Sequence, residues 1–246
     1  DPMTSLNPTM KIGRQIEEVL KGRKGYSKKE VREKVLKILE MVGISDAKKR
    51  YKQYPYELSG GMKQRVMIAI ALVGNPGIVI ADEPTTSLDV TIEASILDLL
   101  NELQKTLHTA IIFITHDLGV IAKLCDRVMV MYGGKIVERG TVEEIYYDTK
   151  HPYTAGLMNS IARLDLEKSV KLKPIEGTPP DLFAPPEGCP FAARCEYAMN
   201  ICYRKMPPEF GEKDKHRCMC WLQDEKAPKI RLKTQLSGKK GGEEHV

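Results

Sequence analysis

The sequence predicts an α/β fold, in which helices alternate with short buried strands of a parallel sheet. Two short apolar runs, 78–81 and 110–114, are flanked by segments with helical periodicity, and polar side chains follow each run. Two further strand-like runs, 128–132 and 135–138, are joined by Gly133-Gly134, which is typical of a hairpin turn. Because ligands of open α/β sheets bind at the carboxyl ends of the strands, the polar residues there are the first functional candidates.

Composition favours a globular protein and excludes several classes. Of the 246 residues, 42% are hydrophobic and 29% are charged, which does not fit a chain that is disordered throughout. The net charge of +5 is small and its signs are mixed, so nucleic acid is not an expected partner. The longest strongly apolar run, 66–73, is far shorter than the roughly 20 residues of a spanning helix. If the protein works in transport, another subunit must form the channel.

Helical periodicity and end signals place the helices. Ser27 and Glu30 have the spacing of a capping box, and Ser59 precedes a run that is apolar on most sides. We expect residues 1–26 to form a loop with a short amphipathic segment, and residues 46–57 to form a polar loop. The predicted helices span residues 28–42, 59–73, 91–108, 118–125 and 151–163.

Residues 58–65, Leu-Ser-Gly-Gly-Met-Lys-Gln-Arg, form the first motif that could carry chemistry. Two glycines at the start of a helix let a ligand approach the backbone, where free N–H groups and the helix dipole favour an anion. Ser59 can add a hydroxyl hydrogen bond. The alternative is a plain serine cap before a core helix, and Ser-Gly-Gly alone does not decide between them.

Three acidic residues and one histidine follow at strand and helix ends. Asp82, after the run 78–81, can hold Mg²⁺, and the adjacent Glu83 can polarise an attacking water. The alternative for both is a pair of solvated carboxylates. Asp89 is either functional or the N-cap of the helix that follows. His116, just after the run 110–114, is either functional or structural.

The order of these motifs resembles that of the ABC ATPase family. The octet 58–65 is similar to its signature motif, 78–84 to Walker B, 87–89 to the D-loop and His116 to the switch histidine. The resemblance implies a partial P-loop, RecA-like nucleotide-binding domain with an α-helical subdomain and a small cysteine-rich C-terminal extension. It also implies ATP and Mg²⁺ as ligands.

The resemblance assigns roles to these residues. Two subunits would sandwich two ATP molecules head to tail, with Asp89 linking the two sites. Asp82 would help to hold Mg²⁺, Glu83 would activate water and His116 would steady the γ-phosphate. The residues that would contact the nucleotide held by the partner are those of the signature motif: Ser59, Gly60, Gly61 and Gln64.

The C-terminal half narrows the resemblance to the oligopeptide and dipeptide importers, whose close relatives handle nickel. The stretches 151–154, 177–182 and 188–191 are similar to the extension of those ATPases. The implied partners are a second ATPase subunit, either a copy or a paralogue, the membrane permease subunits and, indirectly, a solute-binding protein. The implied location is peripheral, on the cytoplasmic face of the cell membrane.

The implied domains cover the chain from end to end. A remnant that follows the Q-loop spans 1–8, the helical subdomain 9–57, the ATPase core 58–150, the extension 151–223 and a disordered tail 224–246. Because Asp1 opens the chain without an initiator Met or a preceding strand, we expect a truncated sequence that begins inside a loop.

The sequence departs from the family because G-x-x-x-x-G-K-[ST], the Walker A motif that cradles phosphates, does not occur in it. We therefore expect this chain alone to bind ATP weakly and not to hydrolyse it. An alternative function is a non-hydrolysing regulatory or assembly subunit that supplies only the signature half-site. A DNA-repair ABC ATPase is not favoured, because no long coiled coil or zinc insertion is visible.

Five of the six cysteines fall between residues 189 and 220, and such a cluster indicates a metal site in a cytosolic protein. Four thiolates can hold a 4Fe–4S cluster or Zn²⁺. The resemblance favours 4Fe–4S with a structural role, and Cys218 competes with Cys220 as the fourth ligand. Free thiols are the alternative. The favoured ligands are Cys189, Cys195, Cys202 and Cys220.

Overall fold

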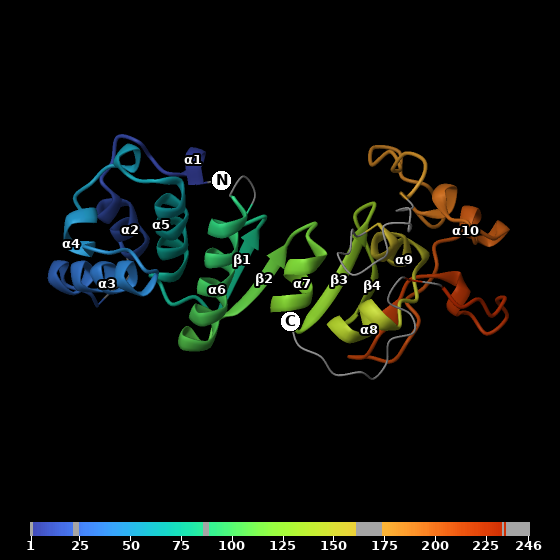
Figure 1. Cartoon of the computed structure of the whole chain (residues 1–246). Coiled ribbons are helices and arrows are strands. Elements are labelled where there is room, and N and C mark those ends of the chain that lie inside the picture. The colour runs from blue at the N-terminus through green and yellow to red at the C-terminus, as the bar shows by residue number, and fades with distance from the viewer. Residues whose placement is uncertain (1, 22–24, 86–88, 161–173, 233, 235–246) are drawn as a thin grey trace. The chain divides into compact units, whose positions relative to one another are not determined.

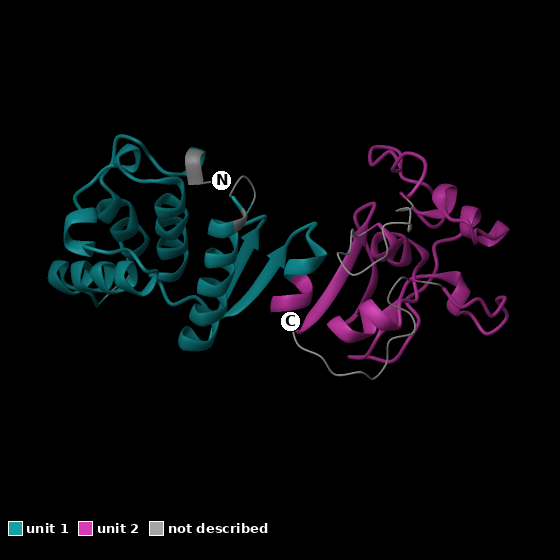
Figure 2. Ribbon diagram, viewed as in Figure 1, with its two compact units in different colours: residues 1–120 teal, residues 121–246 magenta. Residues whose placement is uncertain are grey.

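The computed structural model describes residues 2–21, 25–85, 89–160, 174–232 and 234. The chain divides into two compact units, residues 1–120 and 121–246, which Figure 2 colours separately. Each unit is described by itself. No helix in the described ranges is both long and apolar enough to cross a bilayer.

Unit 1 contains a helical part and a two-stranded sheet (Figure 1). Strands β1 and β2 are parallel, with Ile78 opposite Ala110 and Asp82 opposite Ile114, as the alternation of helices and strands predicts. The elements in chain order are α1 (Pro2–Ser5), α2 (Ile12–Leu20), α3 (Lys28–Met41), α4 (Ala47–Arg50), the 3₁₀ turn Pro55–Glu57, α5 (Gly60–Leu72), β1 (Ile78–Asp82), α6 (Val90–Leu107) and β2 (Ala110–Ile114).

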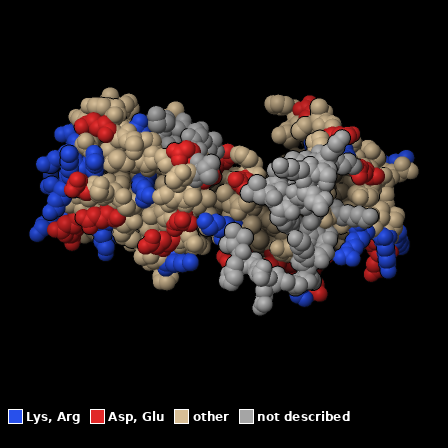
Figure 3. Space-filling model, in the orientation of Figure 1, with Lys and Arg blue, Asp and Glu red and all other residues tan. Residues whose placement is uncertain are grey.

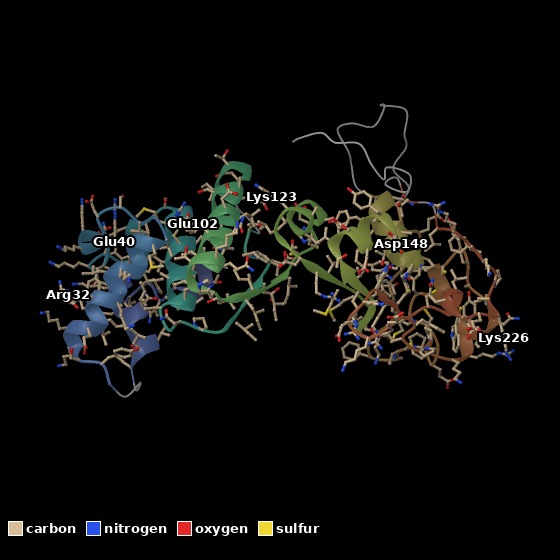
Figure 4. The ribbon with its side chains drawn as sticks, turned by 90° about the horizontal axis from the view of Figure 1, so that it is seen from below. Arg32, Glu40, Glu102, Lys123, Asp148 and Lys226 are labelled. Carbon is tan, nitrogen blue, oxygen red and sulfur yellow. The ribbon has the colours of Figure 1, made fainter. Side chains whose placement is uncertain are left out.

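The core of unit 1 lies where α2, α3, α5 and α6 meet. Helix α3 begins with the predicted capping box of Ser27 and Glu30, and it buries Val35, Ile38 and Leu39 on one face. Its opposite face is charged, and Figure 4 shows the side chains of α3 that include Arg32 and Glu40. Lys and Arg side chains gather at the end of unit 1 that carries α3 and α4 (Figure 3).

Arg65 ties helix α5 to its neighbours. Its guanidinium donates one hydrogen bond to the carbonyl of Val42 at 2.6 Å and another to the hydroxyl of Ser95 at 2.8 Å. The first bond satisfies a carbonyl at the C-terminal end of α3, where the helix leaves such groups unpaired. The position of α5 is therefore fixed by polar contacts as well as by its apolar side chains.

The prediction that both strands of unit 1 are buried is wrong for one face of the sheet. Val79, Ile111 and Phe113 pack against the core, but Ile78 and Ile80 on the other face are 61% and 65% exposed. Successive side chains of a strand point to opposite faces, and the helices of unit 1 cover one face of this pair. An apolar run in sequence shows that both faces are apolar, not that both are covered within the unit.

Unit 2 contains an antiparallel sheet with strand order β3-β4-β5. Gly133 and Gly134 have φ of 55° and 74°, the left-handed values that a tight hairpin turn needs, so the predicted turn is confirmed. Helix α7 (Leu118–Leu124) crosses the boundary between the units. The other elements are β3 (Arg127–Tyr132), β4 (Lys135–Thr141), α8 (Val142–Tyr147), α9 (Pro152–Asn159), the 3₁₀ turn Ala192–Arg194, α10 (Asn200–Arg204), β5 (Arg217–Cys218) and the 3₁₀ turn Trp221–Gln223.

Several short elements differ from the sequence predictions. Helices α1 and α4 lie in predicted loops, because single turns are held by tertiary contacts rather than by their own periodicity. Residues 224–232 and 234 belong to the predicted disordered tail, yet Leu232 and Thr234 are buried. Residues 233 and 235–246 of that prediction, and the end of the predicted helix 151–163, lie outside the described residues.

Candidate functional site

The carboxyl ends of β1 and β2 bring the predicted catalytic residues together. Asp82 is the last residue of β1, and the backbone N–H of Glu83 donates to the carbonyl of Ile114 at 2.8 Å. His116 follows β2 by two residues. Because parallel strands end at the same edge of a sheet, residues 33 positions apart meet there.

Glu83 and His116 form an ion pair at this edge. The carboxylate Oε1 of Glu83 lies 2.9 Å from Nδ1 of His116, and the side chains are 41% and 83% exposed. The hydrogen bond to Glu83, followed by the charge of Glu83 and a smaller effect of Asp117, raises the pKa of His116 above its ordinary value. An exposed pair of this kind contributes little to stability, so its interest is its position.

We expect the pKa of His116, measured by NMR titration of the histidine ring protons, to lie above its ordinary value and to fall in Glu83→Gln. A raised pKa means that His116 carries its charge below that pKa, so the ion pair forms there as long as the Glu83 carboxylate is ionised, and it is lost as the pH rises through the pKa of His116. Glu102→Gln, an exposed change on α6, should leave the titration unchanged. An ordinary pKa in the unmodified chain would contradict the pair.

The backbone of Glu83 is in an uncommon conformation. Its φ of 45° lies in the left-handed region, which costs a non-glycine residue about 1–2 kcal/mol. Such a conformation persists only where the surrounding structure holds it, and such residues concentrate at functional sites. The strained position is the one residue that the resemblance assigns to water activation.

The glycine motif lies at an exposed helix start. Ser59 is the N-cap of α5, and its hydroxyl accepts from the N–H of Met62 at 3.4 Å. A Cβ added at Gly60 would meet open space, whereas one at Gly61 would touch Ile92. The structure therefore leaves this first turn accessible, as the anion-binding interpretation requires, and it also shows the serine cap of the alternative interpretation.

Gln64 points away from that exposed turn. The sequence groups it with the nucleotide contacts, but its side chain is buried and its Nε2 donates to the carbonyl of Pro84 at 2.5 Å. Gln64, Asp82, Glu83 and Pro84 line one cavity of about 490 Å³ among α5, β1 and α6. In this geometry Gln64 supports the residues after β1, and its contact with a nucleotide remains a prediction.

Asp89 caps helix α6. Its Oδ1 accepts a hydrogen bond from the N–H of Ile92 at 3.0 Å, which is the N-cap geometry that the sequence offers as the alternative. Ser87 and Leu88 of the same motif lie outside the described residues. Its proposed part in linking two ATP sites remains a prediction.

Four cysteines of unit 2 line one small cavity of about 10 Å³, together with His151 and Trp221: Cys189, Cys195, Cys202 and Cys220. Burial, with the neighbouring thiols adding to it, raises the pKa of Cys189 to about 11 and that of Cys195 to about 12. Within the described ranges, however, no group of three or more His, Cys, Asp or Glu side chains is arranged to hold a metal ion. The structure therefore gathers the predicted ligands without supporting a metal site.

The structure separates the two competing cysteines. Cys220 lines the cavity, and its pKa is lowered because it accepts a hydrogen bond from the Cys218 thiol. Burial raises the pKa of Cys218 well above the ordinary value. Of the two, Cys220 is placed with the other three cysteines.

A buried carboxylate in unit 2 was not predicted. Glu138 on β4 is 1% exposed and accepts hydrogen bonds from the N–H groups of Lys150 and His151, at 2.6 and 3.0 Å. Its Oε1 also lies 2.8 Å from Nε2 of His216. In the sequence it follows Val137 at the end of a strand, where nothing distinguishes it from a solvated acid.

Models of two families match the chain. That of the ABC transporter matches residues 2–86, and that of the oligopeptide/dipeptide transporter, C-terminal region, matches residues 137–202. The cbiO1 protein of Clostridium perfringens, part of the ABC transporter complex cbiONQ, has a similar structure. It superposes with a TM-score of 0.53 at 32% identity, over 59% of this chain and 56% of that one.

The chain is 55% identical to the dipeptide transport ATP-binding protein DppD of Bacillus subtilis, over 92% of this chain and 68% of that protein. It is 55% identical to the oligopeptide transport ATP-binding protein OppD of the same organism, over 94% of this chain and 64% of that protein. The chain is 52% identical to OppD of Haemophilus influenzae, over 92% of this chain and 69% of that protein. The chain thus spans about two thirds of the length of these relatives. It belongs to the ABC transporter family, among the ATP-binding proteins that carry the oligopeptide/dipeptide transporter C-terminal region.

Proposed function

We propose that this chain is part of an ATP-hydrolysing subunit that energises the import of peptides or similar small solutes across the cytoplasmic membrane. The observation that carries the proposal is the Glu83–His116 pair at the carboxyl ends of two parallel strands, beside Asp82. ATP-binding proteins of dipeptide and oligopeptide transport are its relatives at 55% identity.

The proposed mechanism uses two subunits. Each would contribute Asp82 to hold Mg²⁺ and Glu83 to polarise water, while His116 steadies the γ-phosphate. The exposed start of α5 would approach the nucleotide held by the partner subunit, where backbone N–H groups and the helix dipole favour phosphate. Closure and hydrolysis would then drive permease subunits in the membrane, and the subunit would work at its cytoplasmic face.

The proposal is tested by measuring ATP hydrolysis by two proteins. One is this chain, and the other is this chain extended upstream by the corresponding segment of DppD from Bacillus subtilis. The 246 residues contain no G-x-x-x-x-G-K-[ST], so we expect hydrolysis only in the extended protein. If the 246 residues alone hydrolyse ATP, and this activity depends on Glu83, then the phosphates bind to a segment that lacks the G-x-x-x-x-G-K-[ST] motif. No hydrolysis by either protein would favour a regulatory subunit instead.

We also propose that the four cavity-lining cysteines bind a 4Fe–4S cluster that fastens the C-terminal region. The thiolates of such a cluster bind different irons, so they need not converge on one ion. Four neighbouring thiols, of which three are buried and that of Cys195 is half-buried, ionise together only beside compensating positive charge, which iron supplies. The cluster would cross-link residues 189–220.

Iron, sulfide and zinc analysis of anaerobically purified protein checks the second proposal. We expect about four iron and four sulfide per chain, with loss in Cys220→Ser and retention in Cys125→Ser. Zinc in place of iron would indicate the alternative metal, and the absence of all three would leave free thiols.

A further inference from the structure

One hydrogen bond holds Glu83, and another holds the residue that follows it. Its own N–H donates to the Ile114 carbonyl at 2.8 Å, and the carbonyl of the next residue, Pro84, accepts from Nε2 of Gln64 at 2.5 Å. Pro84 has no N–H with which to enter a strand ladder, so its carbonyl is its backbone hydrogen-bonding group. The first bond fixes Glu83 to the sheet, and the second fixes the residue after it to helix α5.

The second bond is significant because Glu83 is strained. A φ of 45° is unfavourable for glutamate, so this conformation persists only where the surrounding structure holds the chain. A change in the φ of Glu83 would redirect its side chain, whose carboxylate now lies 2.9 Å from Nδ1 of His116. The ring of Pro84 fixes its own φ, so the Gln64 bond to the Pro84 carbonyl limits how the chain just after Glu83 can move.

Gln64 also lies one helical turn from the exposed start of α5. Gly60 opens the helix, and the four-residue step to Gln64 is close to the 3.6 residues of a turn. Backbone hydrogen bonds hold the residues of a helical turn in fixed relative positions. The same turn therefore has the glycine motif at its start and the side-chain contact to Pro84 at its end.

We propose that Gln64 is a positioning residue that couples the glycine-rich start of α5 to the carboxylate of Glu83. The inference deepens the proposed function and rests on it, because there the glycine motif contacts the nucleotide of the partner subunit and Glu83 acts in its own subunit's site. Gln64 would then make the orientation of the water-activating carboxylate in one site depend on whether nucleotide occupies the other. Such dependence is a coupling free energy between two sites.

A matched pair of substitutions separates this role from simple packing. Gln64→Met keeps the length of the side chain and removes the donor. Gln104→Met makes the same change on α6, in a residue that lines the same cavity. Both variants lose one carboxamide from one cavity, and they differ in whether that carboxamide holds Pro84.

NMR titration of His116 in this 246-residue chain reports where the Glu83 carboxylate lies. The His116 ring signals are assigned by their loss in His116→Asn. We expect Gln64→Met to lower the pKa of His116 towards its ordinary value, in the same direction as Glu83→Gln, and Gln104→Met to leave it unchanged. Equal titrations in Gln64→Met and the unmodified chain would overturn the proposal, as would equal changes in the two methionine variants.

A second measurement covers the case in which Gln64→Met does not fold. In the unmodified chain, the side-chain N–H of Gln64 donates a hydrogen bond to the Pro84 carbonyl oxygen. We expect an NMR scalar coupling across this bond, between the Nε2 nitrogen of Gln64 and the carbonyl carbon of Pro84. The absence of that coupling overturns the proposal. Neither measurement uses ATP. Failure of the extended protein to hydrolyse ATP would refute the proposed function without changing these results, so the two failures are distinguishable.

Discussion

Glu83→Gln is expected to lower ATP turnover by about 10²–10⁴-fold in the extended protein, the contribution typical of a general base. The amide has nearly the same size as the carboxylate but no negative charge, so it neither polarises the attacking water nor pairs with His116. ATP binding should be retained, because the phosphates and Mg²⁺ are assigned to other groups. Single-turnover hydrolysis and nucleotide titration on the same sample separate the two effects.

Two further variants make this result specific. Glu102→Gln removes an exposed carboxylate from α6 and should retain full turnover. His116→Ala should also reduce turnover, because it removes the partner of Glu83 and the group assigned to the γ-phosphate. Turnover in Glu83→Gln that equals that of Glu102→Gln would refute the role of Glu83 and leave the ion pair a surface contact.

The elements that the sequence predicts well are those whose signals are local. The capping box of Ser27 and Glu30 and the left-handed pair Gly133-Gly134 depend on residues within a few positions of one another. The meeting of Glu83 and His116 is a long-range contact, yet parallel strand pairing places it, because both residues follow strands of equal length that pair from end to end. Pattern and topology together were sufficient there.

The long-range polar contacts could not be predicted in this way. Gln64 and Pro84 are 20 positions apart, and no periodicity distinguishes a glutamine that supports a loop from one that faces solvent. Grouping Gln64 with a ligand-binding motif followed from its neighbours in sequence, whereas its partner depends on how α5 packs beside β1. The exposed face of β1 has the same cause, since burial is a property of what covers a strand.

Glu138 is the strongest case of a residue that only the packed structure reveals. Its carboxylate is buried and its oxygens accept from Lys150, His151 and His216. Glu138→Ala would leave these three donors in a site with little water, and breaking a buried pair by removing one partner costs about 3–5 kcal/mol. We therefore expect the free energy of unfolding of unit 2 to fall by about that amount.

The single tryptophan makes this loss measurable in a chain of two units. Trp221 lies in unit 2, where its Nε1 donates to the carbonyl of Lys205, so its fluorescence in urea reports the unfolding of that unit. Glu212→Ala removes an exposed acid of the same unit and should change the midpoint little. A midpoint in Glu138→Ala that equals the one in Glu212→Ala would mean that water satisfies the three donors. A large difference would establish that the carboxylate joins the middle of β4, the residues just before α9 and the segment before Cys218, which no local sequence signal indicates.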